Sequence, residues 1–331
     1  MGTGRGLSSK LPTLGTGPLS GGGKPVVPPL SLSTMWAQGR FKHMAEFVAK
    51  ARELGFTHVE ASSSLSREML DELMETSVPI SSVHAPCPAS VSSRGIPVAS
   101  LSLSSTDAAE RREAVRAVKR TIDIASRTGA RAVIIHLGEV PVDAGLEDKL
   151  RSLFREGLVG SEVYVKAREQ LIAERSSRAA RYLEQAVRSL DELSEYGELA
   201  GIRLGLENRL HFREIPDINE MAALLARVEG STVGYWHDVG HAEVQQRLGF
   251  NRHEEWLRCF GPRMIGIHLH DVTGISDHGV PGRGDVDWGM IVKYLGQDVI
   301  RTCEINQGND EGLVREAVPF LEKMGIIGRV R

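Results

Sequence analysis

A repeated alternation between short β-like runs and longer helical patterns constrains the fold of this chain more than any other feature. Eight β-like runs occur, at residues 28–35, 57–62, 79–86, 131–138, 201–208, 231–238, 264–271 and 299–306. Strands that alternate with helices form parallel sheets, because each helix returns the chain to the same edge. Eight such units within about 300 residues predict an α/β fold with one closed (β/α)8 barrel of the TIM type, rather than an open sheet.

The segments between these runs carry the spacing of helices. In residues 40–54, apolar side chains recur at helical spacing, and Gly55 follows as a C-terminal cap. The same spacing occurs in residues 107–129 and 309–325. The connection between the fourth and fifth strands is longer and contains a helical run over 162–196. Its first part, residues 139–161, either folds over the barrel mouth or forms a surface insertion.

Composition limits the partners and the compartment. Apolar residues make up 41% of the chain and the net charge is −3, so no basic field favours nucleic acid or an anionic membrane as a partner. No apolar run approaches the roughly 18–20 residues that cross a bilayer. The three cysteines, Cys87, Cys259 and Cys303, are scattered and lack a CxxC spacing. We therefore expect a reduced, cytoplasmic protein.

The N-terminal segment differs from the rest of the chain. Residues 1–25 consist mostly of Gly, Ser, Pro and Thr, and such a composition buries too little surface to order itself. We expect a flexible tail over residues 1–25 and a single barrel over residues 26–331. The tail has no apolar centre of the kind found in secretory signals, and its glycines and prolines disfavour the amphipathic helix of a transit peptide.

Polar side chains gather near the carboxyl ends of the predicted strands. They alternate with apolar neighbours and so take the inward-facing positions of the barrel. These residues are Glu60, His84, His136, Glu207, His268, His270 and Glu304. Taken alone, Glu60 is more commonly the partner of a barrel arginine, and a single histidine at a strand end is more commonly a hydrogen-bonded rim residue. Barrel enzymes nevertheless place their chemistry at this end.

The stretch "HDVGH", residues 237–241, adds further candidate ligands. Asp238 and His241 are three positions apart, close enough to bind one metal ion or two neighbouring ions. Seven of the eleven histidines fall at strand ends or in the loop after the seventh strand. Buried carboxylates and imidazoles crowded at one rim repel each other or stay unsatisfied without a cation. The pattern therefore indicates a divalent metal ion.

Short motifs at these strand ends carry a family resemblance. They are "HAP" (84–86), "IIHLG" (134–138), "LEN" (206–208), "DVGH" (238–241), "HLHD" (268–271), "DHGVPGRGDVDW" (277–288) and "CEIN" (303–306). In this order, they make residues 26–331 resemble the xylose-isomerase-like TIM barrel superfamily. That group includes sugar and sugar phosphate isomerases and epimerases, and also the abasic-site nucleases of the endonuclease IV type.

The resemblance to the epimerase-like members implies a site for one ion, Mn²⁺, Co²⁺, Mg²⁺ or Zn²⁺. The matching ligand positions are Glu207, Asp238, His268 or His270, and Glu304. His268 is favoured over His270, because "HLHD" then matches the common HxxD form. Glu207 and Glu304 are the implied acid and base, which move a proton through a metal-stabilised enediolate.

The nuclease-like members, by contrast, bind three zinc ions through additional histidines. The positions that match those histidines are His84, His136, His241 and His278. Two departures weaken this alternative: Asp277 directly adjoins His278 where the family has Asp-x-His, and "NRLHFRE" after Glu207 replaces a stretch of small residues. The net charge also supplies no positive stripe along which DNA could lie.

These observations favour a metal-dependent sugar or sugar phosphate isomerase or epimerase with a small-molecule sugar substrate. The candidate substrate-binding residues are His84, His136, His241, His270, His278 and Arg283. Arg283, in "PGRGD", either holds an anionic group or is a solvated side chain in a tight turn. The alternatives are an endonuclease IV-like hydrolase or lyase, and a metal-binding barrel without turnover of its own. Homo-oligomers are common in the family and are an expectation here.

Overall fold

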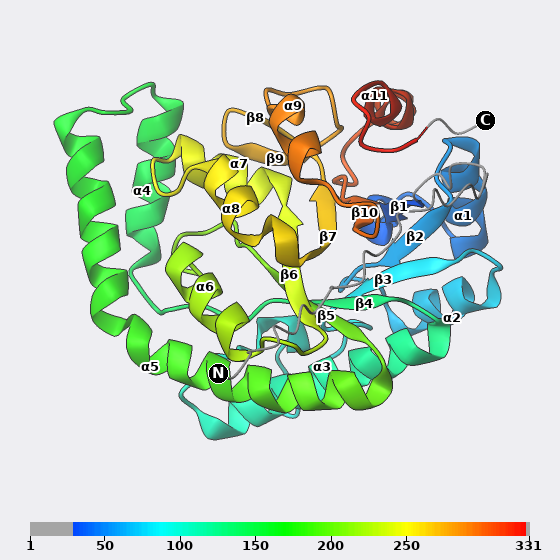
Figure 1. Ribbon diagram of the computed structural model, residues 1–331, viewed down its shortest axis with the longest axis horizontal. Coiled ribbons are helices and arrows are strands. Elements are labelled where there is room, and N and C mark those ends of the chain that lie inside the picture. Colours follow the sequence, from blue (N-terminus) through cyan, green and yellow to red (C-terminus); the bar gives the residue numbers. More distant parts are fainter. Residues whose placement is uncertain (1–28, 329–331) are drawn as a thin grey trace, which may run out of the picture.

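The computed structural model describes residues 29–328, and the tail expected at residues 1–25 lies outside them. Eight parallel strands close into a ring in the order β1-β10-β7-β6-β5-β4-β3-β2 (Figure 1). They are β1 (Leu30–Ser33), β2 (His58–Ala61), β3 (Ile80–His84), β4 (Ala132–Ile135), β5 (Arg203–Glu207), β6 (Val233–Asp238), β7 (Met264–Leu269) and β10 (Ile300–Cys303). Each strand lies within one of the eight predicted runs, so the predicted barrel is confirmed.

Helices surround the ring of strands (Figure 1). The longer ones are α1 (Met44–Glu53), α2 (Arg67–Glu75), α3 (Ala108–Thr128), α4 (Ala144–Arg155), α5 (Glu162–Ala200), α6 (Ile218–Arg227), α7 (Val239–Arg247) and α8 (His253–Phe260). Three short ones follow, α9 (Trp288–Ile291), α10 (Glu311–Val314) and α11 (Ala317–Lys323). The helix predicted over 309–325 is thus split in two. Pro319 explains the break, because its ring clashes with the carbonyl group of Arg315 in a continuous helix.

The long connection between β4 and β5 forms two helices outside the barrel. Asp143 caps α4, since its side chain accepts a hydrogen bond from the Gly145 backbone N–H at 2.9 Å. The helix α4 then lies alongside α5 at the edge of the molecule (Figure 1). The segment 139–161 is therefore largely a helical insertion at the side of the barrel. None of the helices in the described part of the chain has both the length and the hydropathy to span a bilayer.

One tryptophan fills the interior of the ring beneath the rim. Trp236 of β6 is completely buried and packs against Ala132, Ile134 and Ile300. Glycine on the neighbouring strand β7 makes this possible, because a Cβ atom at Gly266 would lie 2.0 Å from the Trp236 ring. The indole ring contacts the His268 ring edge-on, with centroids 5.2 Å apart. Trp236 therefore fills the barrel interior directly below the polar side chains of the rim.

Candidate metal centre

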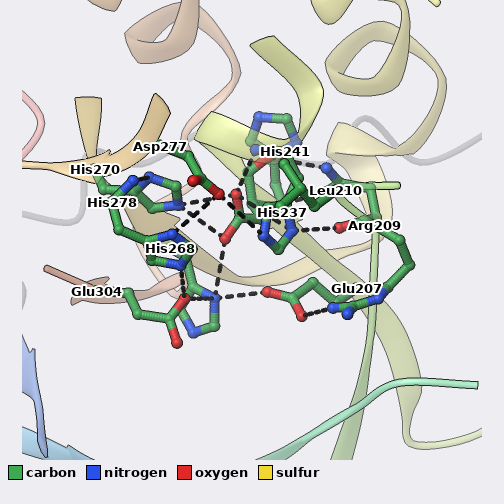
Figure 2. A network of polar contacts seen from close by, with 12 residues as sticks. Glu207, Arg209, Leu210, His237, His241, His268, His270, Asp277, His278 and Glu304 are labelled. Carbon is green, nitrogen blue, oxygen red and sulfur yellow. Dashed lines mark hydrogen bonds and ion pairs between the residues drawn. The ribbon is translucent and has the colours of Figure 1, made fainter. Parts of the chain in front are cut away.

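Four neighbouring strands place acidic and imidazole side chains at one point of the rim (Figure 2). Glu207 ends β5, Asp238 ends β6, His268 lies near the end of β7, and Glu304 directly follows β10. Asp238 and His268 are register partners across the β6–β7 pair, which aligns their side chains. All four residues are buried, and one donor atom of each lies within 4.8 Å of the others. We call these four residues the central group.

Distances within the central group show that its four side chains converge on one point. The Nδ1 atom of His268 lies 2.7 Å from Glu207 Oε1, 3.1 Å from Glu304 Oε2 and 3.4 Å from Asp238 Oδ2. Burial opposes protonation of His268, but the carboxylates of Glu304, Glu60 and Glu207 outweigh it and hold its pKa well above the ordinary value. Three carboxylates around one nitrogen are an arrangement in which a divalent ion can take the place of the proton.

The two histidines of "HLHD" have different surroundings. His270 Nδ1 accepts a hydrogen bond from the His278 backbone N–H at 2.8 Å, so the neutral ring carries its proton on Nε2. That Nε2–H donates to the two Asp238 carboxylate oxygens at 2.9 and 3.0 Å. His270 therefore orients Asp238, whereas His268 presents Nδ1 to the three carboxylates. The geometry supports His268 as the ligand and His270 as a positioning residue.

Glu60 has a role that its sequence position did not suggest. It contacts no barrel arginine in the described structure, but accepts a hydrogen bond from Ser82 Oγ at 2.8 Å and lies 3.2 Å from His268 Nε2. A carboxylate behind the far nitrogen of an imidazole ligand fixes the ring and its tautomer. The commoner arrangement, in which a strand glutamate pairs with a barrel arginine, is thus not found for Glu60 among the described residues, because His268 of β7 occupies that place.

Asn208, which follows Glu207, ties the ends of β5 and β6 together. Its side-chain amide donates to the Asp238 carbonyl oxygen at 2.9 Å and its Oδ1 accepts from the Asp238 backbone N–H at 2.8 Å. The hydroxyl of Tyr235 donates to the same Oδ1 at 2.9 Å. These bonds fix the backbone from which two of the central carboxylates project.

Two further sets of donor atoms flank the central group. The inner triad is His84, His136 and Glu207, and the outer triad is His241, Asp277 and His278. A fourth set, which overlaps these, is Asp238, His270, His278 and Glu304. The structure therefore brings six of the seven strand-end and loop histidines to the rim, whereas His237 contacts Tyr235 and His253 instead. Because Glu207 belongs to both the inner triad and the central group, and His278 to both the outer triad and the fourth set, the sets form one continuous polar network. Figure 2 shows its central and outer parts.

Asp277 lies with His241 and His278, although its spacing in the sequence counted against this. The nuclease-like members have Asp-x-His where Asp277 directly adjoins His278, and that departure counted against a full set of ligands. On a regular strand, neighbouring residues also point to opposite faces. Asp277 and His278 lie in β9 (Ser276–Gly279), which pairs with β8 (Asp271–Thr273) in a small antiparallel hairpin. His278 adopts a left-handed conformation with φ 56°, which breaks the alternation and turns both side chains toward His241. A spacing of one residue is therefore compatible with the outer triad.

The donor atoms fit a divalent ion. Asp277 Oδ2 is buried and, apart from an ion-pair contact of 3.0 Å with His278 Nδ1, has no hydrogen-bond partner among the described residues. Such atoms are costly unless a cation or another donor satisfies them. The donors are carboxylate oxygens and imidazole nitrogens without a thiolate, a set that suits Mn²⁺, Co²⁺, Mg²⁺ or Zn²⁺.

One predicted residue lies apart from the network. Arg283 donates to Glu316, and its side chain is 46% exposed. The structure thus places it at the surface beside α11 rather than with the ligand sets, in line with the solvated-turn interpretation. An arginine that the sequence analysis passed over, Arg209, is instead buried beside Glu207.

A cavity of about 680 Å³ opens beside the inner triad. Its lining includes Ser100, Ser102, Ser105, His136, Arg209 and Glu214. Gly138 lets the serine-bearing loop approach the end of β4, since a Cβ atom there would lie 2.0 Å from Ser102 Oγ. The volume is that of a typical small-molecule site. The loops that form it lie between β3 and α3 and after β5, where the strand pattern gives no information.

We expect metal binding at the central group to release a proton. The raised pKa of His268 keeps its ring protonated near neutral pH, whereas a ligand must offer a free lone pair. The carboxyl groups need no such change, because His268 and its neighbours hold the pKa of Glu207 well below the ordinary value despite its burial. The apparent affinity for Mn²⁺ or Zn²⁺ should therefore rise about tenfold per pH unit while His268 remains protonated.

Isothermal titration calorimetry in two buffers with different ionisation enthalpies measures this release directly. Close to one proton should leave for each ion bound at the central group between pH 6 and pH 7, as one pKa governs the exchange. A binding enthalpy that is the same in both buffers would contradict the expectation.

A closed (β/α)8 barrel with a carboxylate and imidazole centre at its carboxyl-terminal rim defines a known class of barrel protein. Residues 48–324 match the family described as xylose isomerase-like TIM barrel. The match covers most of the chain, and the protein belongs to that family.

Relatives and solved structures extend this result. Protein y4fM of Sinorhizobium fredii is 25% identical over 194 residues, 58% of this chain. The chain spans about half the length of the curated relatives it matches, 52% of y4fM and 45% of MJ1311 of Methanocaldococcus jannaschii.

Among solved structures, a D-tagatose 3-epimerase-like protein is 20% identical with a TM-score of 0.62, over 90% of this chain and 98% of the other. The IOLI protein, whose structure holds a zinc atom, is 14% identical with a TM-score of 0.60, over 90% and 96%. L-ribulose 3-epimerase is 15% identical with a TM-score of 0.59, over 92% and 88%. At these identities the similarity shows a shared fold.

Proposed function

We propose that this protein is a metal-dependent sugar isomerase or epimerase that transfers a proton at a carbon next to a carbonyl group. The observation that carries the proposal is the placement of two buried glutamates, Glu207 and Glu304, on either side of His268 (Figure 2). Epimerisation needs a proton acceptor on one face of a carbon and a proton donor on the other. Sugar epimerases among the structures with the same fold are consistent with this assignment.

Both glutamates are ionised, which is the form in which a carboxylate can accept a proton. Burial opposes ionisation of Glu304, but His268 and His278 outweigh it and hold its pKa at about 2. A divalent ion, when bound, supplies stabilisation of the negative charge that develops on the substrate oxygens. Glu207 and Glu304 then take the proton from one face and return one to the other. His241 and His278, at the outer edge of the network, are placed to hold substrate hydroxyl groups.

The chemistry of the cavity favours a neutral, hydroxyl-rich substrate. Its lining combines serine and threonine hydroxyls with the carboxylates of Asp107, Glu110, Glu139 and Glu214. Among residues 29–328, Arg209 is the one arginine of the lining, and it is already paired with Glu207 and Glu214. A phosphate dianion would therefore meet carboxylates there without a free cation from the described part of the chain. We therefore propose an unphosphorylated sugar as substrate, and a cytoplasmic enzyme that uses Mn²⁺, Co²⁺, Mg²⁺ or Zn²⁺.

Incubation in heavy water tests the proposal. Protein loaded with each of the four ions should exchange a carbon-bound proton of at least one ketose in a panel for deuterium, as seen by NMR. Treatment with a chelator should stop the exchange, and return of the ion should restore it, because a bound ion would stabilise the negative charge that develops on the substrate oxygens. Protein that carries the ion yet exchanges no proton in any sugar would contradict an isomerase or epimerase.

Two other functions remain candidates, each with its own observation. The linked inner triad, central group and outer triad offer donors for several ions, as in an endonuclease IV-like hydrolase or lyase. Cleavage of an oligonucleotide that contains one abasic site would reveal that activity. A metal-binding barrel without turnover would bind ion and ligand but give no product in either assay. Homo-oligomerisation is a separate proposal, which sedimentation measures.

A further inference from the structure

The side chain of Arg209 lies at the inner triad. Its Nη1 donates to Glu207 Oε2 at 2.9 Å and also contacts His136 Nε2, while its Nη2 donates to Glu214 Oε1 at 2.8 Å. Figure 2 shows the guanidinium group directed at the Glu207 carboxylate. The residue is only 8% exposed, so this cation is held away from bulk water.

The atoms that Arg209 contacts are the ones that a metal ion would use. His84 Nε2 lies 3.7 Å from Glu207 Oε2, and His136 Nε2 contacts the same oxygen, so the three donors surround a single point. A donor N–H directed at His136 Nε2 occupies the lone pair that a metal ion requires. A dication at this point would also lie next to a guanidinium that carries the same sign of charge.

Two anchors hold Arg209 in this place. Glu214 binds its Nη2 and is itself fixed, because Glu214 Oε2 accepts from the His211 backbone N–H at 2.8 Å. The backbone carbonyl of Arg209 accepts from Gln245 Nε2 at 2.6 Å. An arginine held at both its backbone and its side chain does not swing away at little cost, since one anchor is a part-buried ion pair and the other a buried hydrogen bond.

We propose that Arg209 is a built-in cation that takes the place of a metal ion at the inner triad, so that ions bind only outside this triad. Removal of the guanidinium group then opens a further metal site formed by His84, His136 and Glu207. The inference concerns the number of ions per chain and is independent of the sugar reaction proposed above.

Metal counting tests the inference. The full-length protein and its Arg209→Ser variant are stripped with a chelator, reloaded with Zn²⁺ or Co²⁺, passed through a desalting column and analysed by inductively coupled plasma mass spectrometry. Arg209→Ser should hold one ion per chain more than the wild type. The double variant Arg209→Ser/His136→Ala should lose that additional ion, because it lacks one of the three donors.

Two control variants distinguish the effect of the lost positive charge from a general disturbance of the structure. Arg209→Lys keeps a cation beside Glu207 and should hold the wild-type number of ions. Arg213→Ser removes an arginine four positions away, which pairs with Glu139 and Glu147 rather than with the triad, and should also leave the number unchanged. A gain of an ion in Arg213→Ser as large as that in Arg209→Ser would overturn the inference.

Crystals of the wild-type protein grown with Zn²⁺ provide a test that needs no variant. Anomalous scattering should show zinc only outside the inner triad, and a peak enclosed by His84, His136 and Glu207 would overturn the proposal. Equal ion counts in folded wild type and Arg209→Ser would do the same. A wild type without any ion at the central group would instead remove the metal-dependent function, while an ion gained by Arg209→Ser would still support the role of Arg209.

Discussion

Glu304→Gln is expected to lower kcat for proton exchange by about 10³-fold, the scale of a lost general base. The amide has the size of the carboxylate but neither accepts the proton at neutral pH nor carries the negative charge that faces His268. Deuterium incorporation into the substrate and its rate, followed by NMR, measure the effect. The affinity for the metal ion should fall as well, because one of four charged or imidazole donors is lost.

A matched variant distinguishes this effect from a general effect of charge removal. Glu53→Gln makes the same chemical change on the surface, where Glu53 pairs with Lys50 and Arg315. It should leave the exchange rate within a factor of two of the wild type, since exposed ion pairs contribute little. Turnover by Glu304→Gln within tenfold of the wild-type rate would show that Glu304 is not the acid or base.

Trp236→Ala is expected to reduce the free energy of unfolding by about 3–5 kcal/mol, as for other fully buried aromatic side chains. The indole ring fills the space between the strands and supports the His268 ring, so its loss leaves a cavity under the rim. Gly266→Ala should destabilise the fold by overpacking, by about 1–3 kcal/mol, because the added Cβ atom overlaps the Trp236 ring. Urea unfolding monitored by circular dichroism measures both changes.

Gly261→Ala provides the comparison for these variants. The backbone at Gly261 has helical angles, φ −49° and ψ −43°, and an added Cβ atom would lie 3.6 Å from Tyr294, an ordinary contact. Its stability should stay within about 0.5 kcal/mol of the wild type, as for surface substitutions without strain. If Gly266→Ala were equally harmless, the close packing of Trp236 against β7 would not be a constraint on this barrel.

The fold and the convergence of polar side chains at one rim were predictable from short-range patterns, whereas the choice of the four central residues came from the resemblance to the family. Each strand carries its own alternation, and the parallel barrel brings all carboxyl ends to one rim, so Glu207, Asp238, His268 and Glu304 meet without any knowledge of loops. What the strand pattern omits is how the loops between strands fold. It therefore gave no sign that Arg209 turns back onto the inner triad.

The contacts that were missed are of this second kind. Glu60 meets His268 across the interior from a strand that is not its neighbour in the ring, so no local motif marks the pair. Asp277 reaches the outer triad because the backbone of His278 is left-handed, and the sequence gives no sign of that conformation at a histidine. Charged residues shortly after a strand-end glutamate, such as Arg209 and Glu214, were the one available signal, and they deserved weight as candidate rim residues.

The order of the strands has a consequence for how the protein matures. Glu304 follows β10, the last strand of the ring, which pairs with β1 at the opposite end of the chain. A nascent chain in which β10 has not yet emerged therefore holds only three of the four donors of the central group. A divalent ion that needs all four donors would bind only after β10 has closed the ring, so its binding would distinguish a closed barrel from an open one.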